Sequence, residues 1–207
     1  MERVMECPFC RIKNLDGSLY CCQCGEYIEA DRSAKSEPTT AVAERKYVTA
    51  LFSDLSGYTT LCERLDPERV KEILNHIFNE IALIIKKYDG YIARLIGDEI
   101  LTFFGYPKTH EDDPIRAVRA ALEIQGKIES LNTLYLHETV QPLRMHTGIG
   151  TGLIVTGEMN PEQGREGFTG HAINVASRLT KLARAGETFI NIDTYLQTKH
   201  SFHFEEQ

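Results

Sequence analysis

The most constraining stretch of this sequence is a pair of apolar runs, Tyr91–Ile96 and Ile100–Phe104, separated by Gly97, Asp98 and Glu99. Apolar, β-branched and aromatic residues on both sides of a Gly-Asp pair predict a tight β-hairpin. The two strands are too apolar to be surface strands, so their acidic tip needs an explanation. Aspartate is a good turn residue, and this simple explanation stays open. The alternative is that Asp98 holds a divalent cation.

A second carboxylate follows another apolar strand. Val48–Phe52 predicts a strand buried on both faces, and it leads into Asp54, Gly57 and a helical segment, Tyr58–Leu65. Two carboxylates at neighbouring strand ends form an oxygen-rich site, and Mg²⁺ usually takes one or two carboxylates together with substrate phosphates. The turn before the helix also directs backbone N–H groups outward, which suits phosphate.

Three motifs carry a family resemblance. Phe52–Thr59 resembles the first metal motif of the class III nucleotidyl cyclases, and Arg94–Asp98 resembles their second, usually Lys-x-x-Gly-Asp. Asn174–Leu179 resembles their transition-state motif, Asn-x-Ala-Ser/Ala-Arg. The motifs occur in family order, and the resemblance covers about residues 45–205.

The resemblance implies an α+β fold, with helices packed on one face of a ferredoxin-like antiparallel sheet. It implies a phosphorus-oxygen lyase that converts a nucleoside triphosphate to a 3′,5′-cyclic monophosphate and pyrophosphate, with two Mg²⁺ or Mn²⁺ ions per active site on Asp54 and Asp98. Arg178 would stabilise charge on the α-phosphate, and Asn174 would orient the ribose. Because these groups come from opposite subunits in the family, a homodimer with composite active sites is expected. On their own, Asn174 and Arg178 read equally well as polar residues four apart on one helix face.

The resemblance also implies a nucleotide-binding set: Gly57, Tyr58, Arg94, Gly97, Arg144 and Gly167. Arg94 replaces the base-reading lysine and favours ATP, because this donor-only side chain suits adenine N1. The second base-reading position falls on Gly167, which has no side chain. The glycine-rich segment Leu143–Gly152 resembles the family strand Arg-x-Gly-Ile-His-x-Gly. By this match Arg144 is a candidate phosphate contact, and a surface salt bridge is the alternative. Gly150 stands where the family strand has its histidine. Glycines inside a strand also predict close backbone approach or a bulge.

Residues 1–28 are predicted to form a zinc ribbon. They hold five of the six cysteines, including the Cys-x-x-Cys pairs Cys7/Cys10 and Cys21/Cys24. Four thiolates form a closed tetrahedral Zn²⁺ site, which would supply the folding energy of so short a segment. Cys22 is spare, although pairing of Cys22 with Cys24, a disulfide staple and a disordered cysteine-rich tail are alternatives. Residues 29–45 are polar and predict a linker, and 46–207 form the predicted cyclase catalytic domain.

Periodicity and capping residues predict the remaining elements. They are a helix from Asp66-Pro67 to about Tyr88, a helix Ile115–Leu131, a strand Leu153–Glu158, a polar loop Asn160–Gly167, a helix from Gly170 to Arg184, a strand Glu187–Ile192 and a short helix from Asp193.

Composition excludes some functions. The net charge of −7 argues against nucleic-acid binding. No apolar run approaches the length of a membrane helix, and the N-terminus lacks the apolar core of a signal peptide. A cytoplasmic protein without nucleic-acid or membrane partners is therefore expected.

The resemblance leaves rival interpretations. The family's closing strands and their phosphate-binding lysine have no counterpart before Gln207, so further C-terminal domains or a regulator are expected as partners. Together with Arg94 and Gly167, this difference favours a degenerate cyclase-like module that binds nucleotide or regulates a partner without turnover. A guanylate cyclase is another alternative. A diguanylate cyclase fits less well, because Ile96–Ile100 only partly resembles its hairpin motif.

Overall fold

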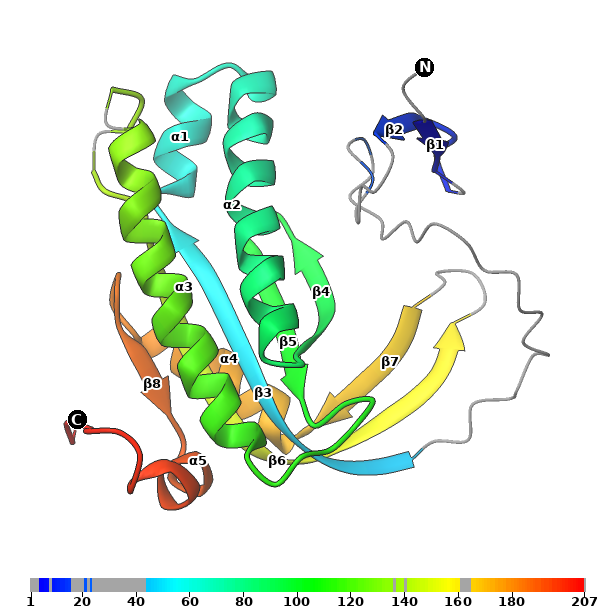
Figure 1. Ribbon diagram of the computed structural model, residues 1–207, viewed down its shortest axis with the longest axis vertical. Helices are drawn as coiled ribbons and strands as arrows, with labels where there is room; N and C mark the ends of the chain where they lie inside the picture. Colours follow the sequence, from blue (N-terminus) through cyan, green and yellow to red (C-terminus); the bar gives the residue numbers. More distant parts are fainter. Residues whose placement is uncertain are drawn as a thin grey trace. The chain divides into compact units, whose positions relative to one another are not determined.

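The computed structural model describes residues 4–7, 9–15, 21, 23, 44–135, 137–139, 141–160 and 165–206. The chain divides into two compact units, Met1–Thr40 and Ala41–Gln207. In the first unit, the strands β1 (Val4–Glu6) and β2 (Lys13–Leu15) pair antiparallel. The second unit contains a six-stranded sheet and the helices around it (Figure 1).

The sheet is mostly antiparallel, with strand order β4-β5-β3-β6-β7, and β8 pairs in parallel with β6. Its strands are β3 (Glu44–Ser56), β4 (Tyr91–Ile96), β5 (Glu99–Phe104), β6 (Arg144–Asn160), β7 (Arg165–Gly170) and β8 (Thr188–Ile190). The central strand β3 is apolar on both faces, because β5 and β6 flank it and helices cover the sheet on either side. This arrangement confirms the predicted α+β class.

The helices within the described residues are α1 (Tyr58–Arg64), α2 (Pro67–Lys87), α3 (Asp113–Tyr135), α4 (His171–Leu182) and α5 (Ile192–Thr198). Helix α2 begins at Pro67 after the N-cap residue Asp66, as its sequence predicts. Its fully buried isoleucines recur every four residues, at Ile73, Ile77, Ile81 and Ile85. This spacing places them on one face of the helix.

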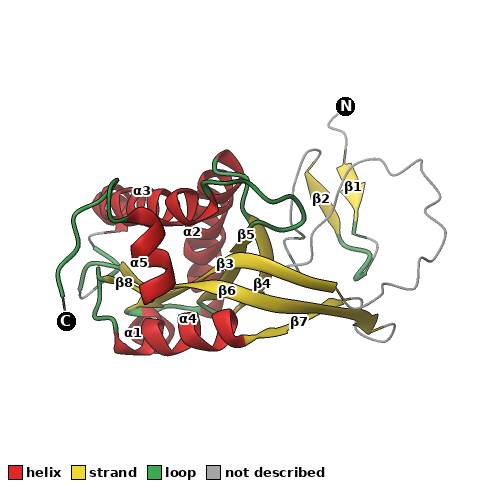
Figure 2. Ribbon diagram, turned by 90° about the horizontal axis from the view of Figure 1, so that it is seen from below, coloured by secondary structure: helices red, strands yellow, loops and turns green. Residues whose placement is uncertain are grey.

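Helices cover both faces of the sheet, and the predicted one-sided arrangement is wrong. Leu51 and Leu55 of β3 share a core with α2 and α3, whereas Phe52 packs on the opposite face with Ala172 and Ala176 of α4. Figure 2 shows α2 and α3 on one side of the strands and α4 on the other. Successive strand residues point to opposite faces, so a strand that is apolar throughout needs cover on both.

Glycines on β6 allow α4 to approach the sheet closely. A Cβ atom on Gly148 would lie 2.1 Å from the backbone oxygen of Ala176, and one on Gly150 would lie 2.8 Å from that of Ala172. The predicted close backbone approach of the glycine-rich segment is therefore confirmed. Thr180 of α4 also donates to the backbone oxygen of Phe52 on β3, at 3.3 Å. Helix α4 thus packs directly against the backbone of β6 and β3.

Two strand predictions need correction. β7 begins at Arg165, inside the predicted polar loop 160–167. The segment lacks apolar alternation, and its strand conformation comes from pairing with β6 and from the packing of Phe168 against Phe103. The expected strands 143–152 and 153–158 are parts of one long strand, β6, which pairs along its length with β3.

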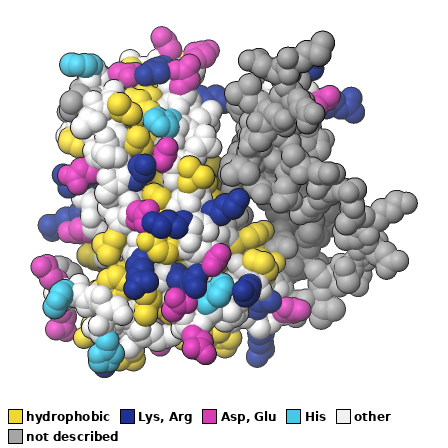
Figure 3. All heavy atoms as spheres, viewed as in Figure 1, with side chains coloured by type: hydrophobic (Ala, Val, Ile, Leu, Met, Phe, Trp, Pro, Cys, Tyr) yellow, Lys and Arg dark blue, Asp and Glu magenta, His cyan; other side chains and the backbone are white. Residues whose placement is uncertain are grey.

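The outer surface of α2 and α3 carries many charged side chains beside a few exposed leucines. Ion pairs link the two helices, with Lys87 Nζ 2.7 Å from Glu123 Oε2 and Lys127 Nζ 3.0 Å from Glu80 Oε2. Figure 3 shows acidic and basic side chains interspersed over this face. Among the described residues, no helix combines the length and apolar character that a membrane crossing requires.

Candidate active site

Asp54 lies near the end of β3, where the strand approaches α1. Its side chain is 33% exposed, and its Oδ2 lies 3.2 Å from Nε2 of His146. Its Oδ1 accepts a hydrogen bond from the backbone N–H of Leu55 at 3.0 Å. In register, Asp54 pairs with Glu99 on β5 and with His146 on β6, so the three side chains lie side by side on the face that carries α4. A partly exposed carboxylate therefore lies near the end of the central strand, between β5 and β6.

Asp98 occupies the turn of the β4–β5 hairpin that the sequence predicts. The last paired residues are Ile96 and Glu99, and Gly97 adopts a φ of 61°, which glycine accepts without steric cost. Partial burial raises the pKa of Asp98 to about 6, and the negative charge of Asp54 and a side-chain hydrogen bond with it add to the shift. The hairpin thus brings Asp98 against Asp54.

Gly57 and Tyr58 lie at the connection between β3 and α1. Gly57 is the N-cap of α1 and has a φ of 92°, so a side chain there would be strained. The pKa of Tyr58 is raised mainly by a hydrogen bond with Cys62, then by burial and by the charges of Cys62 and Asp98. The charge of Asp98 contributes to this shift, so Tyr58 lies within electrostatic range of that carboxylate. Gly57 and Tyr58 follow the end of the strand that carries Asp54, and Gly97 adjoins Asp98 in the hairpin turn.

This group of residues fits a divalent cation. Two carboxylates that repel each other raise the pKa of one of them, and a bound cation removes that repulsion. Both side chains are partly exposed, so a cation and a phosphate can reach them from solvent. Carboxylate oxygens are the ligands that Mg²⁺ and Mn²⁺ prefer. Asp54 and Asp98 would hold such an ion, and its positive charge would offset that of a triphosphate.

Asn174 and Arg178 lie on the exposed face of α4. The opposite face of the helix, with Ala172 and Ala176, packs against β6. Neither Asn174 nor Arg178 makes a hydrogen bond or ion pair with any residue that the structure describes. Both side chains are available to a ligand, and neither contacts the carboxylates of its own chain.

Arg94 and Gly167 are exposed on β4 and β7. Aromatic rings connect the two strands. The ring centroid of Phe168 on β7 lies 6.2 Å from that of Tyr91 on β4 and 4.8 Å from that of Phe103 on β5. Arg94 follows a register shift in β4, after which it pairs with Leu101. Among the described residues, Arg94 has no ion-pair partner.

His146 is a residue of this site that the sequence reasoning missed. The motif Arg-x-Gly places its arginine two residues before Gly148, and that position is His146, not Arg144. Arg144 is exposed and lies near Gly186, where an added Cβ would be 3.2 Å from an arginine nitrogen. The stricter alignment on Gly148 could have identified His146 from the sequence.

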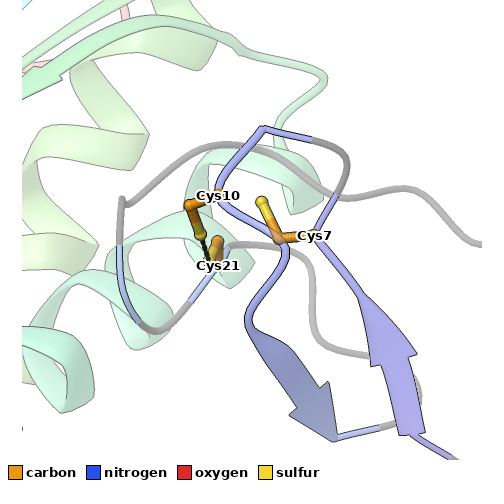
Figure 4. A group of neighbouring side chains, drawn as sticks. All are labelled: Cys7, Cys10 and Cys21. Carbon is orange, nitrogen blue, oxygen red and sulfur yellow. Dashed lines mark hydrogen bonds between the residues drawn. The ribbon is translucent and has the colours of Figure 1, made fainter.

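Three of the four predicted zinc ligands lie together in the first unit. The sulfur atoms of Cys7, Cys10 and Cys21 are within 4.8 Å of one another (Figure 4). Asn14 Nδ2 and the backbone N–H of Gln23 donate to Cys21 Sγ at 3.7 and 3.4 Å. Donors of this kind stabilise thiolate, the form that binds metal. Cys22 and Cys24 lie outside the described residues.

Known proteins resemble this chain over the whole of the larger unit. A family model described as "Adenylate and Guanylate cyclase catalytic domain" matches residues 41–207. A membrane guanylyl cyclase of Dictyostelium discoideum is 28% identical over 185 residues, which are 88% of this chain and 12% of that protein. Adenylate cyclase 1 of Rhizobium meliloti is 31% identical over 139 residues, 66% of this chain and 21% of that protein.

A solved structure extends the resemblance to the fold. The adenylyl cyclase CyaB from P. aeruginosa matches with a TM-score of 0.73 and 32% identity, over 77% of this chain and 84% of that one. The chain spans only 12% and 21% of the length of the two relatives named above. Adenylyl and guanylyl cyclases both occur among these proteins, so similarity alone leaves the base open. Sequence, fold and the arrangement of the two aspartates agree that this chain belongs to the adenylate and guanylate cyclase catalytic domain family.

Proposed function

We propose that this domain is an adenylate cyclase that converts ATP to 3′,5′-cyclic AMP and pyrophosphate. The observation that carries the proposal is the pair of repelling carboxylates, Asp54 and Asp98, in a chain that also exposes Asn174 and Arg178 on α4. Cyclases of this class use Mg²⁺ or Mn²⁺, and two such ions on Asp54 and Asp98 would acidify the attacking hydroxyl and offset the charge of the triphosphate.

The reaction needs positioning more than covalent chemistry. The ribose 3′-oxygen forms a bond to the α-phosphorus and gives its proton to water, while the bond from the α-phosphorus to the bridging oxygen breaks and pyrophosphate leaves. Arg178 would donate hydrogen bonds to the α-phosphate oxygens, where negative charge develops. Asn174 would hold the ribose so that its 3′-oxygen lies in line with the leaving group.

We infer that the active site is composite and requires two copies of the chain. Asn174 and Arg178 make no contact with Asp54 or Asp98 of the same chain, in the part that the structure describes. One solved relative is described as a non-canonical dimeric guanylyl cyclase domain, and the same fungal domain is also described as monomeric. Arg178 of one subunit would therefore serve the aspartates of the other.

Mixing two inactive variants tests this arrangement. Asp54→Ala loses a cation ligand and Arg178→Ala loses the transition-state cation, so each homodimer should be inactive. Their heterodimer has one site with neither lesion and should recover about a quarter of wild-type activity in an equal mixture, because half the dimers are mixed and each has one intact site of two. Mixing two preparations of the same variant is the control. No recovery after proven subunit exchange would refute the composite site.

Arg94 supports ATP as the preferred substrate. An arginine donates to adenine N1 but cannot accept from guanine N1–H or its amino group. It can also donate to guanine O6, and Gly167 adds no side-chain contact, so discrimination should be only about 1–3 kcal/mol. Solved relatives include a guanylate cyclase domain in complex with GTP and a rhodopsin-guanylyl cyclase core with converted specificity in complex with ATPαS, so this fold can hold either nucleotide.

Product analysis tests the reaction and the base together. The purified protein is incubated with ATP or GTP and Mn²⁺, and the products are separated and identified by mass spectrometry. We expect cyclic AMP, a higher kcat/KM for ATP and a shift towards GTP in Arg94→Glu. Preference for GTP in the unmodified protein would show that it is a guanylate cyclase. Nucleotide binding without any cyclic product would favour the degenerate module, which the missing side chain at Gly167 supports.

We further propose that the N-terminal unit binds one structural Zn²⁺ through Cys7, Cys10, Cys21 and Cys24. The clustering of three of these sulfur atoms supports the site. Elemental analysis of the purified protein should give about one zinc per chain, and Cys7→Ser should reduce that amount while Cys62→Ser, at an exposed cysteine of α1, should not. A metal-free protein with Cys7 in a disulfide would refute this. Co-purification with the intact N-terminal unit would identify a partner, a regulator or a further domain.

A further inference from the structure

We propose that a cavity between two loops, away from the carboxylate pair, binds a small phosphate ester that carries a hydroxyl group, such as a sugar phosphate or a nucleotide. The turn from α2 to β4 and the loop from β5 to α3 form this cavity, which has a volume of about 280 Å³. Ligand pockets in proteins usually start at about 300 Å³, so only a compact ligand fits. The charged and ring-bearing side chains that line it are Lys86, Asp89, Tyr91, Tyr106, Lys108 and His110.

The cavity lies at the opposite end of the β4–β5 hairpin from Asp98. Tyr91 begins β4 and Tyr106 lies just after the end of β5, whereas Asp98 occupies the turn between the strands. Figure 1 shows both connections at the lower end of these strands. Each strand has six residues, so at about 3.3 Å per residue about 20 Å separates the cavity from the turn. The described lining contains none of the residues assigned to the cyclase reaction.

Two lysines give the cavity positive charge. Lys86 lies in the last turn of α2 and Lys108 in the loop after β5, and both side chains are exposed. Neither makes an ion pair or a hydrogen bond with another described residue. The carboxylate of Asp89 also lines the cavity, but Arg116 Nη1 lies 2.7 Å from its Oδ2 and offsets its charge. Arg116 also contacts Asp112, outside the lining, at 2.7 Å. Two ammonium groups from different elements, each with three N–H donors, suit a phosphate.

His110 is held so that one ring nitrogen can accept a hydrogen bond from a ligand. The buried carboxylate of Asp113 accepts the backbone N–H of His110 at 2.8 Å and lies 3.1 Å from its Nδ1. A carboxylate only accepts, so Nδ1 donates and Nε2 of the neutral ring is an acceptor. Asp89 Oδ2 lies 4.0 Å from Nε2, which is beyond hydrogen-bond distance. Nε2 therefore suits a ligand hydroxyl, and for this reason we assign a phosphate ester instead of inorganic phosphate.

Isothermal titration calorimetry in EDTA tests the site, because the carboxylate pair has no cation with which to hold a phosphate under these conditions. Inorganic phosphate, ribose 5-phosphate and AMP are titrated into the full-length protein at constant ionic strength. Ribose 5-phosphate should bind more tightly than inorganic phosphate, since it offers alcohol hydroxyls to His110. Equal affinity for AMP and ribose 5-phosphate would identify a sugar phosphate site, and tighter binding of AMP would identify a nucleotide site.

Two substitutions each remove one positive charge from the cavity. Lys86→Gln and Lys108→Gln lie at exposed positions, so the fold should tolerate both. Each should weaken the binding of ribose 5-phosphate by about five- to tenfold, between the effects of an exposed ion pair and of a charged hydrogen bond. Lys71→Gln, at an exposed lysine elsewhere on α2, is the matched control. Arg178→Ala removes the phosphate-binding arginine proposed for the active site. Both of these variants should bind ribose 5-phosphate as the unmodified protein does.

The outcomes separate this site from nonspecific attraction and from the active site. Absence of binding, or an equal loss in Lys71→Gln, would overturn the proposal. A loss in Arg178→Ala without a loss in the two cavity variants would place the binding in the active site and would overturn it as well. Inorganic phosphate that binds as tightly as ribose 5-phosphate would overturn the role of His110. Absence of any cyclic product would overturn the proposed function alone, because these binding measurements require no turnover.

Discussion

Replacing Asp98 by asparagine should stabilise the metal-free protein above pH 6. The pKa of Asp98 is raised from 3.8 to about 6 by burial and by Asp54, so the folded state holds a proton that the unfolded state releases between these values. Folding stability therefore falls as the pH rises from 3.8 to 6, and the full cost remains above pH 6. A shift of about two pH units corresponds to at most about 3 kcal/mol. Partial exposure to solvent reduces this to about 1 kcal/mol.

Urea denaturation in EDTA at pH 8 and pH 4 measures this effect. At pH 8 we expect Asp98→Asn to gain about 1 kcal/mol, or about 2–4 °C in Tm for a domain of this size. At pH 4 the gain should largely vanish, because the wild-type carboxyl is then protonated. Adding Mn²⁺ should stabilise the wild type but not the variant.

The control substitution is Asp66→Asn, at the exposed N-cap of α2, which has no side-chain capping bond and where asparagine caps equally well. It should change stability little at either pH. A loss of stability in Asp98→Asn at pH 8, or a gain that persists unchanged at pH 4, would refute the raised pKa of Asp98 and its cost to folding.

Two further predictions concern packing, and urea denaturation measures both. Gly148→Ala should cost about 1–3 kcal/mol or more, because its Cβ would lie 2.1 Å from the backbone of Ala176, whereas Gly126→Ala, in open space on α3, should gain about 0.5–1 kcal/mol. Similar effects at the two glycines would contradict the close packing of α4 against β6. Ile77→Ala, at a fully buried position, should cost about 2–5 kcal/mol, whereas the exposed Leu83→Ala should change stability by about 0.5 kcal/mol or less. A small loss at Ile77 would place it outside the core.

The sequence predicted the elements whose pattern is local. The apolar spacing of α2 and the Gly-Asp turn between β4 and β5 identify a helix and a hairpin within short windows, and the structure confirms both. The meeting of Asp54 with Asp98 could also be anticipated, because Asp54 lies near the end of one core strand and Asp98 in the turn that precedes another. What the carboxylates bind stays a prediction.

Other features depend on contacts between distant segments. β7 has no periodic signal of its own, and its conformation comes from pairing with β6. The position of α4 on the second face of the sheet could not be predicted locally. It depends on Gly148 and Gly150 facing a helix that begins more than twenty residues later in the chain. The contact of His146 with Asp54 depends on the register between β3 and β6, which neither strand specifies alone.

The close packing of α4 on β6 has a consequence for how Arg178 can move. Where side chains separate a helix from a sheet, rotamer changes let the helix slide or rotate by small steps. Here the helix backbone rests on strand backbone at Gly148 and Gly150, so no side chain separates the two elements at these positions. Any motion that moves Arg178 relative to a bound nucleotide must carry β6 with it.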